Sequence, residues 1–275
     1  MMGAEIALVF ALAGRDVRLN DAIRGRIDAA LENLKTLLKK GAARGFWSGE
    51  QAEAALGRIN PAPDLTEFAD RDFVIEAVFE DEAVKAEVLR KLDDICAAGC
   101  LIASNTSSIS ITVLASHLSA ARRPRFLGTH FFSPVSRMKL VEVVPGLDTS
   151  AEAVAVAIAA CAAAGKTAIP VKDVVGFAVN RLLHAFLIEA MRLVEEGAAT
   201  PADIDTACRL GLGHPIGPFE MMDLVSNPLV LQVQTVLADA YGERFKPPLR
   251  LKQMVKAGHY GRRAGRGWVV EGAGS

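Results

Sequence analysis

Hydrophobic residues recur with two different periods along the first 173 residues of the chain. Short runs rich in β-branched and aromatic residues are typical of strands, and the longer stretches between them have the spacing of helices. Strands are predicted at Val17–Leu19, Phe73–Val78, Leu101–Ser104, Phe126–Phe131, Leu140–Val144 and Thr167–Val171. This alternation predicts an α/β domain with a mostly parallel sheet covered by helices.

The first helices are predicted from capping and turn residues as well as from spacing. One begins at Gly3 and ends at Gly14, because glycine adopts the left-handed backbone angles of a helix cap at little cost. A second helix is predicted at Ala22–Lys40, and a third, at Gly49–Leu56, leads into a turn at Pro61–Pro63.

From Gly176 to the end, the pattern is helical alone. One long helix is predicted at Phe177–Glu196, and Thr200 caps the next helix, with Pro201 in its first turn. Further helices are predicted at Asp203–Leu210, Pro218–Leu224, Pro228–Tyr241 and Pro248–Ala257. We therefore expect an α/β domain at residues 1–173 and a smaller all-α domain at residues 174–275.

Charge and hydropathy exclude several classes of protein. The chain carries 31 Lys and Arg against 32 Asp and Glu, so nothing in its net charge of −1 favours nucleic acid or an anionic membrane as a partner. The longest apolar run, Ala153–Ala164, is shorter than the ~18–20 residues that a membrane span requires. Ile6–Gly14 imitates the core of a signal peptide, but Glu5 stands where a positive charge belongs, which favours a buried helix.

The cysteines indicate a reducing compartment. The four of them, Cys96, Cys100, Cys161 and Cys208, lie in apolar surroundings without the paired C-x-x-C spacing of a zinc site. This usage is typical of reduced thiols in a cytoplasmic protein, and no other cluster has the spacing of metal ligands. We expect a cytoplasmic protein without a metal site.

Two carboxylates stand on apolar faces of predicted strands. Glu76 lies in FVIEAV and Glu142 in LVEVV, each at a position whose neighbours on the same face are apolar. Burying an unpaired carboxylate costs several kcal/mol, so each must face water or find a partner. For Glu76 both alternatives stay open, since an edge strand with one wet face would accommodate it. For Glu142 a histidine nearby in the sequence favours a site.

That histidine is His130, which ends a predicted strand in GTHFFSP, where open parallel sheets display catalytic groups. A lone histidine is more often structural, but a carboxylate partner would fix its tautomer and raise its basicity. The segment Asn105–Ser108 (NTSS) follows another strand and would either cap a helix or contact a ligand. Asn180 lies one turn into an apolar helix, where its amide needs partners.

Taken in order, several segments resemble the L-3-hydroxyacyl-CoA dehydrogenase family, which includes the 3-hydroxybutyryl-CoA dehydrogenases. They are IEAVFED, ASNTSSISI, GTHFFSPVSRMKLVEVV, KDVVGFAVNRLL, GLGHPIGPFEMMDL and GRRAGRGW. The resemblance covers essentially the whole chain, and an ordered series of motifs is far more specific than a single glycine pattern. It implies a Rossmann-like NAD-binding domain followed by a helical domain that binds substrate and forms a homodimer.

The resemblance assigns a role to each candidate residue of the reaction. It implies that His130 is the general base of a reversible oxidation of L-3-hydroxyacyl-CoA with NAD, as in the β-oxidation of fatty acids. Glu142 orients the imidazole and stabilises its charged form. Ser107 and Asn180 match the serine and asparagine that contact the substrate and bind its reacting oxygen.

The resemblance also assigns the cofactor and the nucleotide of the substrate. Asp21 matches the acid that holds the adenosine ribose, which favours NAD over NADP. The remaining positions that match cofactor contacts are Gly3, Glu80, Lys85, Asn105 and Ser133. Lys39 and Lys40, at the end of a predicted helix, would meet the phosphates of an acyl-CoA substrate.

Two departures from the family pattern affect these expectations. Ser133 replaces the asparagine of the family's HFFNP, so a contact to cofactor or substrate is expected to change. The opening MMGAEIA aligns with the last glycine of the family's G-x-G-x-x-G, so the first strand and two glycines have no counterpart. Losing that central strand would leave its two neighbours with unpaired edges. We expect a start site assigned too late, rather than a true truncation or the loss of dinucleotide binding.

Three functions follow from these observations. The first is oxidation of a short-chain L-3-hydroxyacyl-CoA such as 3-hydroxybutyryl-CoA, supported by Ser107, His130, Glu142 and Asn180 together. The second is oxidation of a free 3-hydroxy acid or sugar acid, suggested by Ser133. The third is an inactive, dimerising homologue, suggested by the missing strand.

Overall fold

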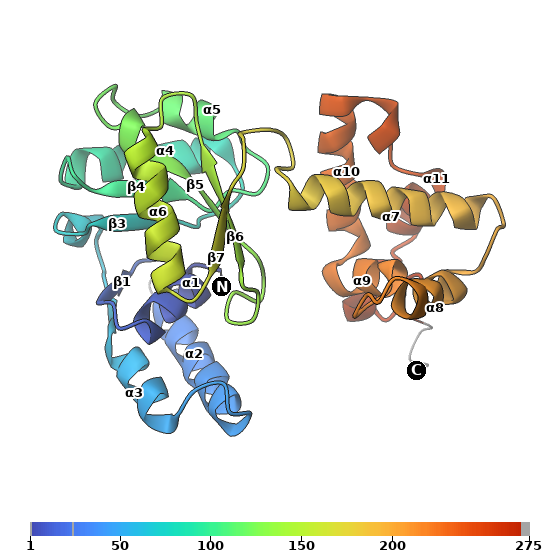
Figure 1. Ribbon diagram of the computed structural model, residues 1–275, viewed down its shortest axis with the longest axis horizontal. Coiled ribbons are helices and arrows are strands. Elements are labelled where there is room, and N and C mark those ends of the chain that lie inside the picture. The colour runs from blue at the N-terminus through green and yellow to red at the C-terminus, as the bar shows by residue number, and fades with distance from the viewer. Residues whose placement is uncertain (1, 24, 271–275) are drawn as a thin grey trace. The chain divides into compact units, whose positions relative to one another are not determined.

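The computed structural model describes residues 2–23 and 25–270, and the chain divides into two compact units, 1–174 and 175–275 (Figure 1). Three parts of the predictions lie outside the described residues: Met1, at the start of the first domain, Arg24, within a predicted helix, and residues 271–275, at the end of the second domain. Each unit has its own hydrophobic core. The first contains all the described strands, and the second consists of helices and short 3₁₀ turns.

A five-stranded sheet, in the order β3-β4-β5-β6-β7, forms the centre of the first unit. Its strands are β3 (Phe73–Glu76), β4 (Leu101–Ser104), β5 (Phe126–Phe131), β6 (Leu140–Pro145) and β7 (Thr167–Pro170). All neighbouring strands are parallel except β5 and β6, which pair antiparallel. The prediction of a mostly parallel, Rossmann-like sheet is therefore confirmed, and the reversal at β6 is a feature that the hydrophobic pattern alone did not predict.

A second, two-stranded sheet consists of β1 (Val17–Leu19) and β2 (Ile59–Pro61), paired in parallel. The turn predicted at Pro61–Pro63 was placed too early, because Pro61 still belongs to a strand. Two of its three residues, Asn60 and Pro61, are of types that are rare in strands, so the sequence did not reveal this strand. In the described part of the chain, β1 pairs only with β2 and β3 only with β4, so each is an edge strand.

Helices cover both faces of the five-stranded sheet. On one face, α1 and α6 pack against odd-numbered positions such as Leu127, Val141 and Val143. On the other, α5 packs so closely that a Cβ at Gly128 would lie 2.6 Å from the Cδ1 atom of Ile111, whose side chain would have to shift. The helices of these two layers are α1 (Met2–Leu12), α4 (Glu82–Ile95), α5 (Ile111–Ser116) and α6 (Ala151–Ala163). Glu76, His130 and Glu142, at even-numbered positions, share the face of α4 and α5.

Helix α2 begins later than the spacing predicts. It spans Arg26–Ala43 rather than 22–40, because the Asp21 carboxylate accepts a hydrogen bond from the Ile23 amide and holds the chain in a turn. Helix α3 (Gly49–Gly57) begins at a capping box in which Ser48 and Gln51 exchange hydrogen bonds. With α1, these helices enclose a small core around Leu8, Leu34 and Leu38.

The helices of the second unit agree in order with the predicted ones. They are α7 (Val179–Glu195), α8 (Pro201–Gly211), α9 (Pro218–Val225), α10 (Asn227–Tyr241) and α11 (Leu249–Lys256). The short 3₁₀ turns of the chain are Leu65–Phe68, Arg123–Arg125, Glu243–Phe245 and Arg262–Ala264. The core of this unit gathers around Leu187, Met191, Phe219 and Leu237. Among the described residues, no helix combines the length and the hydrophobicity needed to cross a bilayer.

Candidate active site

A histidine and a carboxylate face each other across the antiparallel strands β5 and β6. The register places His130 directly opposite Glu142, and the imidazole Nδ1 lies 2.8 Å from the Glu142 Oε2. His130 is 5% exposed and Glu142 is fully buried. Because the carboxylate accepts a hydrogen bond from the Nδ1–H group, it fixes the ring orientation and leaves Nε2 available for another partner.

Nε2 of His130 faces a serine in the loop that follows the neighbouring strand. The hydroxyl Oγ of Ser107, in the loop after β4, lies 3.0 Å from it. The ring of Phe132 packs edge-on against the imidazole, with centroids 4.6 Å apart. Asn105 ties the same loop to β5, since its side-chain oxygen accepts a hydrogen bond from the Phe131 amide at 2.9 Å. The structure thus brings Ser107, His130 and Glu142 into one line of contacts.

Glu76, the other anomalous carboxylate, is buried beside a lysine of α4. Its Oε1 lies 2.9 Å from Nζ of Lys85, and Oε2 accepts a hydrogen bond from the Ser104 hydroxyl at 2.6 Å. Lys85 is 1% exposed and Glu76 is 3% exposed. The alternative of a wet face on an edge strand is therefore wrong, because a buried ion pair compensates this carboxylate instead.

Glu80, which follows β3 in the chain, accepts hydrogen bonds from the loop after β4. Its Oε1 accepts hydrogen bonds from the hydroxyls of Thr106 and Ser108 and from the amides of Ser107 and Ser108, at 2.6 to 2.9 Å. Its Oε2 lies 3.4 Å from Nζ of Lys85. Burial raises the pKa of Glu80, but the Thr106 hydroxyl, the Lys85 charge and the loop amides together hold that pKa below its usual value. Glu80 is therefore an ionised acceptor at neutral pH.

These contacts also decide what the NTSS segment does. The helix that follows, α5, is capped by Ser110, whose hydroxyl accepts a hydrogen bond from the Val113 amide. The helix-cap alternative for Asn105–Ser108 is therefore wrong, and the segment is a loop folded around Glu80. Sequence reasoning missed Thr106, whose hydroxyl is buried in this loop. Its only signal was its place between two residues already selected.

Three of the predicted cofactor residues lie elsewhere on the first unit. Asp21 follows β1 and Ser133 follows β5 as an exposed residue, joined to Pro134 by a cis peptide bond. Gly3 lies in the first turn of α1, where a Cβ would be 3.6 Å from that of Ala77, just beyond the end of β3. The start of α1 therefore lies beside the carboxyl end of β3.

Asn180 lies in the first turn of α7, in the helical unit. The other candidate residues, His130 among them, belong to the first unit. There α7 presents Leu187, Ile188 and Met191 to the core. In the described ranges, no group of three or more His, Cys, Asp or Glu side chains could hold a metal ion.

Lys40 lines a cleft of about 330 Å³ between the second half of α2 and the loop that joins β5 to β6. Three cations and two aromatic rings contribute to its walls: Lys40, Arg44, Arg137, Phe46 and Trp47. Lys39 is exposed but does not belong to the residues of this cleft. The sequence analysis missed Arg44 and Arg137, because the cleft unites segments almost a hundred positions apart in the chain.

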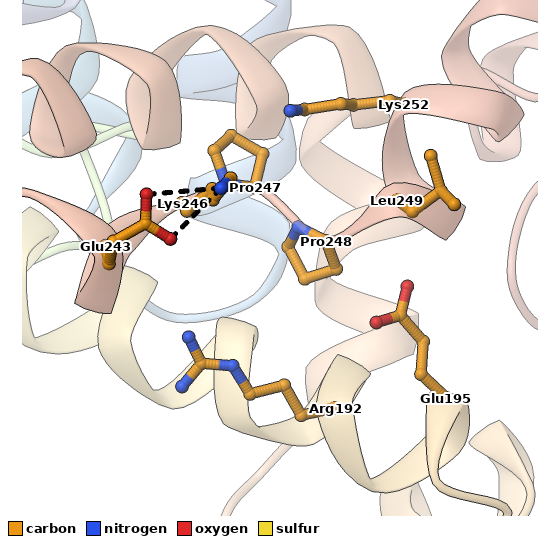
Figure 2. Close-up of a pocket in the computed structure, with 8 residues that line it drawn as sticks. All are labelled: Arg192, Glu195, Glu243, Lys246, Pro247, Pro248, Leu249 and Lys252. Atoms are coloured by element: carbon orange, nitrogen blue, oxygen red, sulfur yellow. Dashed lines mark hydrogen bonds and ion pairs between the residues drawn. The ribbon is translucent and has the colours of Figure 1, made fainter.

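A second cleft, of about 340 Å³, lies in the helical unit (Figure 2). Its walls combine Arg192 and Glu195 of α7 with Lys252 of α11 and the segment between α10 and α11. Lys246 is already paired with Glu243 at 3.0 Å. None of the predicted site residues lines it.

Comparison with known families agrees with both units. The family model described as 3-hydroxyacyl-CoA dehydrogenase, NAD binding domain, matches residues 1–174. The model described as 3-hydroxyacyl-CoA dehydrogenase, C-terminal domain, matches residues 176–271. The two together account for nearly the whole chain.

Individual relatives are similar over almost their full length. The chain is 39% identical to a probable 3-hydroxybutyryl-CoA dehydrogenase of Bacillus subtilis, over 97% of this chain and 93% of the relative. It is also 39% identical to a 3-hydroxybutyryl-CoA dehydrogenase of Mycobacterium tuberculosis, over 98% and 94%. Its structure matches that of (S)-3-hydroxybutyryl-CoA dehydrogenase from Ralstonia eutropha with a TM-score of 0.93 and 36% identity, covering 98% of this chain and 95% of that one.

The buried pair of Lys85 and Glu76 predicts a large loss of stability when its cation is removed. We expect Lys85→Met to lower the free energy of unfolding by ~3–5 kcal/mol, because Glu76 is then buried without a counter-charge. Urea denaturation at pH 7 measures this. Lys91→Met, which removes an exposed lysine of α4 paired with Glu87, should change it by less than ~1 kcal/mol. Similar values for the two variants would contradict the compensating role of Lys85.

Proposed function

The chain belongs to the 3-hydroxyacyl-CoA dehydrogenase family and is an NAD-dependent oxidoreductase, and we propose that its substrate is a short-chain L-3-hydroxyacyl-CoA such as 3-hydroxybutyryl-CoA. The product is the corresponding 3-ketoacyl-CoA, and the reaction is reversible. The observation that carries this proposal is the line of contacts from Ser107 through His130 to Glu142, at the ends of adjacent strands.

In this proposal His130 acts as the general base. Its Nε2 accepts the proton of the 3-hydroxyl group while the C3–H bond breaks, and the C3 oxygen becomes a carbonyl. Glu142, fully buried, stabilises the imidazolium that forms, since it accepts a hydrogen bond from the Nδ1–H group. The Ser107 hydroxyl, once it turns from Nε2 to the substrate, donates a hydrogen bond to the reacting oxygen. A contact of Asn180 with the substrate stays a prediction. NAD, when bound, accepts the hydride that leaves C3.

The residues of the first unit fit a dinucleotide. Carboxylate and amide side chains stand at or just after the carboxyl ends of β1, β3 and β4, where an α/β sheet binds such ligands. The first-turn amides of α1, which include that of Gly3, have no partner within the helix and favour a negative charge. We propose that Asp21 holds the adenosine ribose, and that Glu80, Lys85, Asn105 and Ser133 lie beside the nicotinamide half.

The cleft beside α2 is our proposed site for the coenzyme A nucleotide. Lys40, Arg44 and Arg137 supply positive charge for its phosphates, and the rings of Phe46 and Trp47 supply faces for its adenine. Lys39, exposed next to Lys40, adds to the local potential. A free 3-hydroxy acid has no group for this cleft, so the cleft favours the thioester over that alternative.

Removing the base should abolish turnover. We expect His130→Gln to lower kcat by ~10²–10⁴-fold, because general-base catalysis contributes about that much. The measurement is NADH oxidation with acetoacetyl-CoA. His117→Gln, which changes a partly exposed histidine paired with Glu82, is the matched control and should leave kcat unchanged. A His130→Gln enzyme within about tenfold of the unmodified chain would contradict the general-base role.

Removing a cation from the cleft should weaken binding of the nucleotide and leave the chemistry alone. We expect Lys40→Ala to raise KM for acetoacetyl-CoA about tenfold, since a charge-assisted contact contributes ~1.5–3 kcal/mol and every 1.4 kcal/mol is a factor of ten. Steady-state kinetics with the N-acetylcysteamine thioester, which lacks the nucleotide, should show no change. Lys35→Ala, an exposed lysine paired with Glu32, is the control. Equal losses with both thioesters would exclude this assignment.

We further propose a homodimer formed by the helical unit. Several leucines of this unit expose large apolar surfaces: Leu182, Leu210, Leu212, Leu224 and Leu229. Leu182 is 74% exposed on α7, and such surface is normally covered in a stable assembly. A cytoplasmic location is also proposed, supported by four buried, free cysteines, and cell fractionation tests it.

Light scattering at micromolar concentration should give twice the chain mass of 29.2 kDa. We expect Leu182→Glu to shift the mass toward that of the monomer, because a carboxylate resists burial in an apolar contact. Leu147→Glu, at an 86% exposed position of the first unit, should leave the mass unchanged. A monomer for the unmodified chain would overturn this proposal.

A further inference from the structure

The loop that carries Ser107 is held by one carboxylate. Glu80 contacts three consecutive residues of it, Thr106, Ser107 and Ser108, through a single oxygen, at 2.6 to 2.9 Å. Thr106 in turn accepts hydrogen bonds from the amides of Ser108 and Ile109. The loop lies outside any helix or strand, so these contacts replace the backbone ladder that would otherwise order it.

We propose that Glu80 is a positioning residue of the reaction, which acts by holding the Ser107 hydroxyl against Nε2 of His130. The amide of Ser107 donates to Glu80 at 2.8 Å, while its hydroxyl lies 3.0 Å from the imidazole. The same residue thus connects the carboxylate to the proposed base. This inference rests on the proposed function, in which Ser107 and His130 meet the reacting oxygen.

Lys85 keeps Glu80 in the ionised form that accepts these bonds. Its ammonium lies between two carboxylates, 2.9 Å from Glu76 and 3.4 Å from Glu80, and is almost fully buried. Glu76 also accepts hydrogen bonds from the Ser104 hydroxyl and the Val78 amide. A continuous line of contacts therefore runs from β3 and β4 to the imidazole on β5.

The two oxygens of Glu80 make different contacts. Oε1 accepts all four donors of the loop. Oε2 lies 3.4 Å from Lys85, in a side chain that is 34% exposed. The route that we propose runs through Oε1 and Ser107, so it is compatible with a contact between Oε2 and the nicotinamide half of the cofactor.

A double-mutant cycle tests this route. We expect Glu80→Gln and Ser107→Ala each to lower kcat about tenfold or more, because both loosen the Ser107–His130 contact. The double variant should be no more than about threefold slower than the slower single variant, since both changes remove the same interaction. The Kd for NADH is measured alongside by fluorescence titration, which separates a loss of cofactor binding from a loss of kcat. Multiplied losses in kcat, or an NADH Kd raised tenfold with kcat unchanged, would overturn the proposal.

A readout without turnover separates this inference from the proposed function. NMR titration of the His130 ring in the unliganded protein should show that Glu80→Gln moves the midpoint in the same direction as Ser107→Ala. Glu87→Gln, the same change on an exposed residue of α4, should not move it. An unmodified chain that fails to oxidise NADH would refute the proposed function, whereas a His130 titration unchanged by Glu80→Gln would refute the inference.

A milder variant covers the case in which Glu80→Gln does not fold, as judged by circular dichroism. Thr106→Val keeps the shape of the side chain but removes one of the four donors to Glu80. It should lower kcat about threefold to tenfold and move the His130 midpoint in the direction of Ser107→Ala. A folded Thr106→Val protein with unchanged kcat and an unchanged midpoint would overturn the proposal.

Discussion

A buried carboxylate needs a partner, and this requirement organises the whole site. Glu142 and Glu76 stand on a face of the sheet that α4 and α5 cover, so neither can remain ionised there without a hydrogen-bond donor or a cation. Glu142 is satisfied by the imidazole directly across β5 and β6, and Glu76 by the ammonium of Lys85. The partners are thereby fixed as firmly as the carboxylates. Removing either carboxylate would free a histidine or a lysine that the rest of the site contacts.

The antiparallel direction of β6 is what makes the first of these pairs possible. In that arrangement His130 and Glu142 are cross-strand neighbours, and side chains of such pairs lie on the same face of the sheet. A shift of one residue in the register would turn Glu142 to the opposite face, among Leu101, Ala103 and Leu127. At Gly128 of β5, the side chain of Ile111 from α5 fills the space that a Cβ would take.

The sequence predicted the parts of the fold and site that follow from local rules. Charged residues on apolar strand faces identified Glu76 and Glu142, and His130, at the end of a predicted strand near Glu142 in the sequence, indicated a site before any fold was known. The sequence could not show the direction of β6 or the strand at Ile59–Pro61, since both depend on pairing between distant segments. The start of α2 was placed four residues early, because spacing does not reveal that Asp21 binds a backbone amide. Two of the three cations of the cleft, Arg44 and Arg137, escaped notice for a similar reason, because they meet Lys40 only in the folded chain.

Burial separates two groups of contacts in the first unit. The ion pair of Lys85 with Glu76 and the contact of His130 with Glu142 lie in the interior, where few water molecules compete and each hydrogen bond is strong and directional. Glu80, whose side chain is 34% exposed, connects the first of these pairs to the Ser107 loop nearer the surface. Lys40, Arg44 and Arg137 stand at an open cleft, where water and salt weaken each charge but where side chains adapt to a flexible nucleotide. The buried pairs can therefore set the geometry of proton transfer, while the surface charges set how tightly a substrate is held.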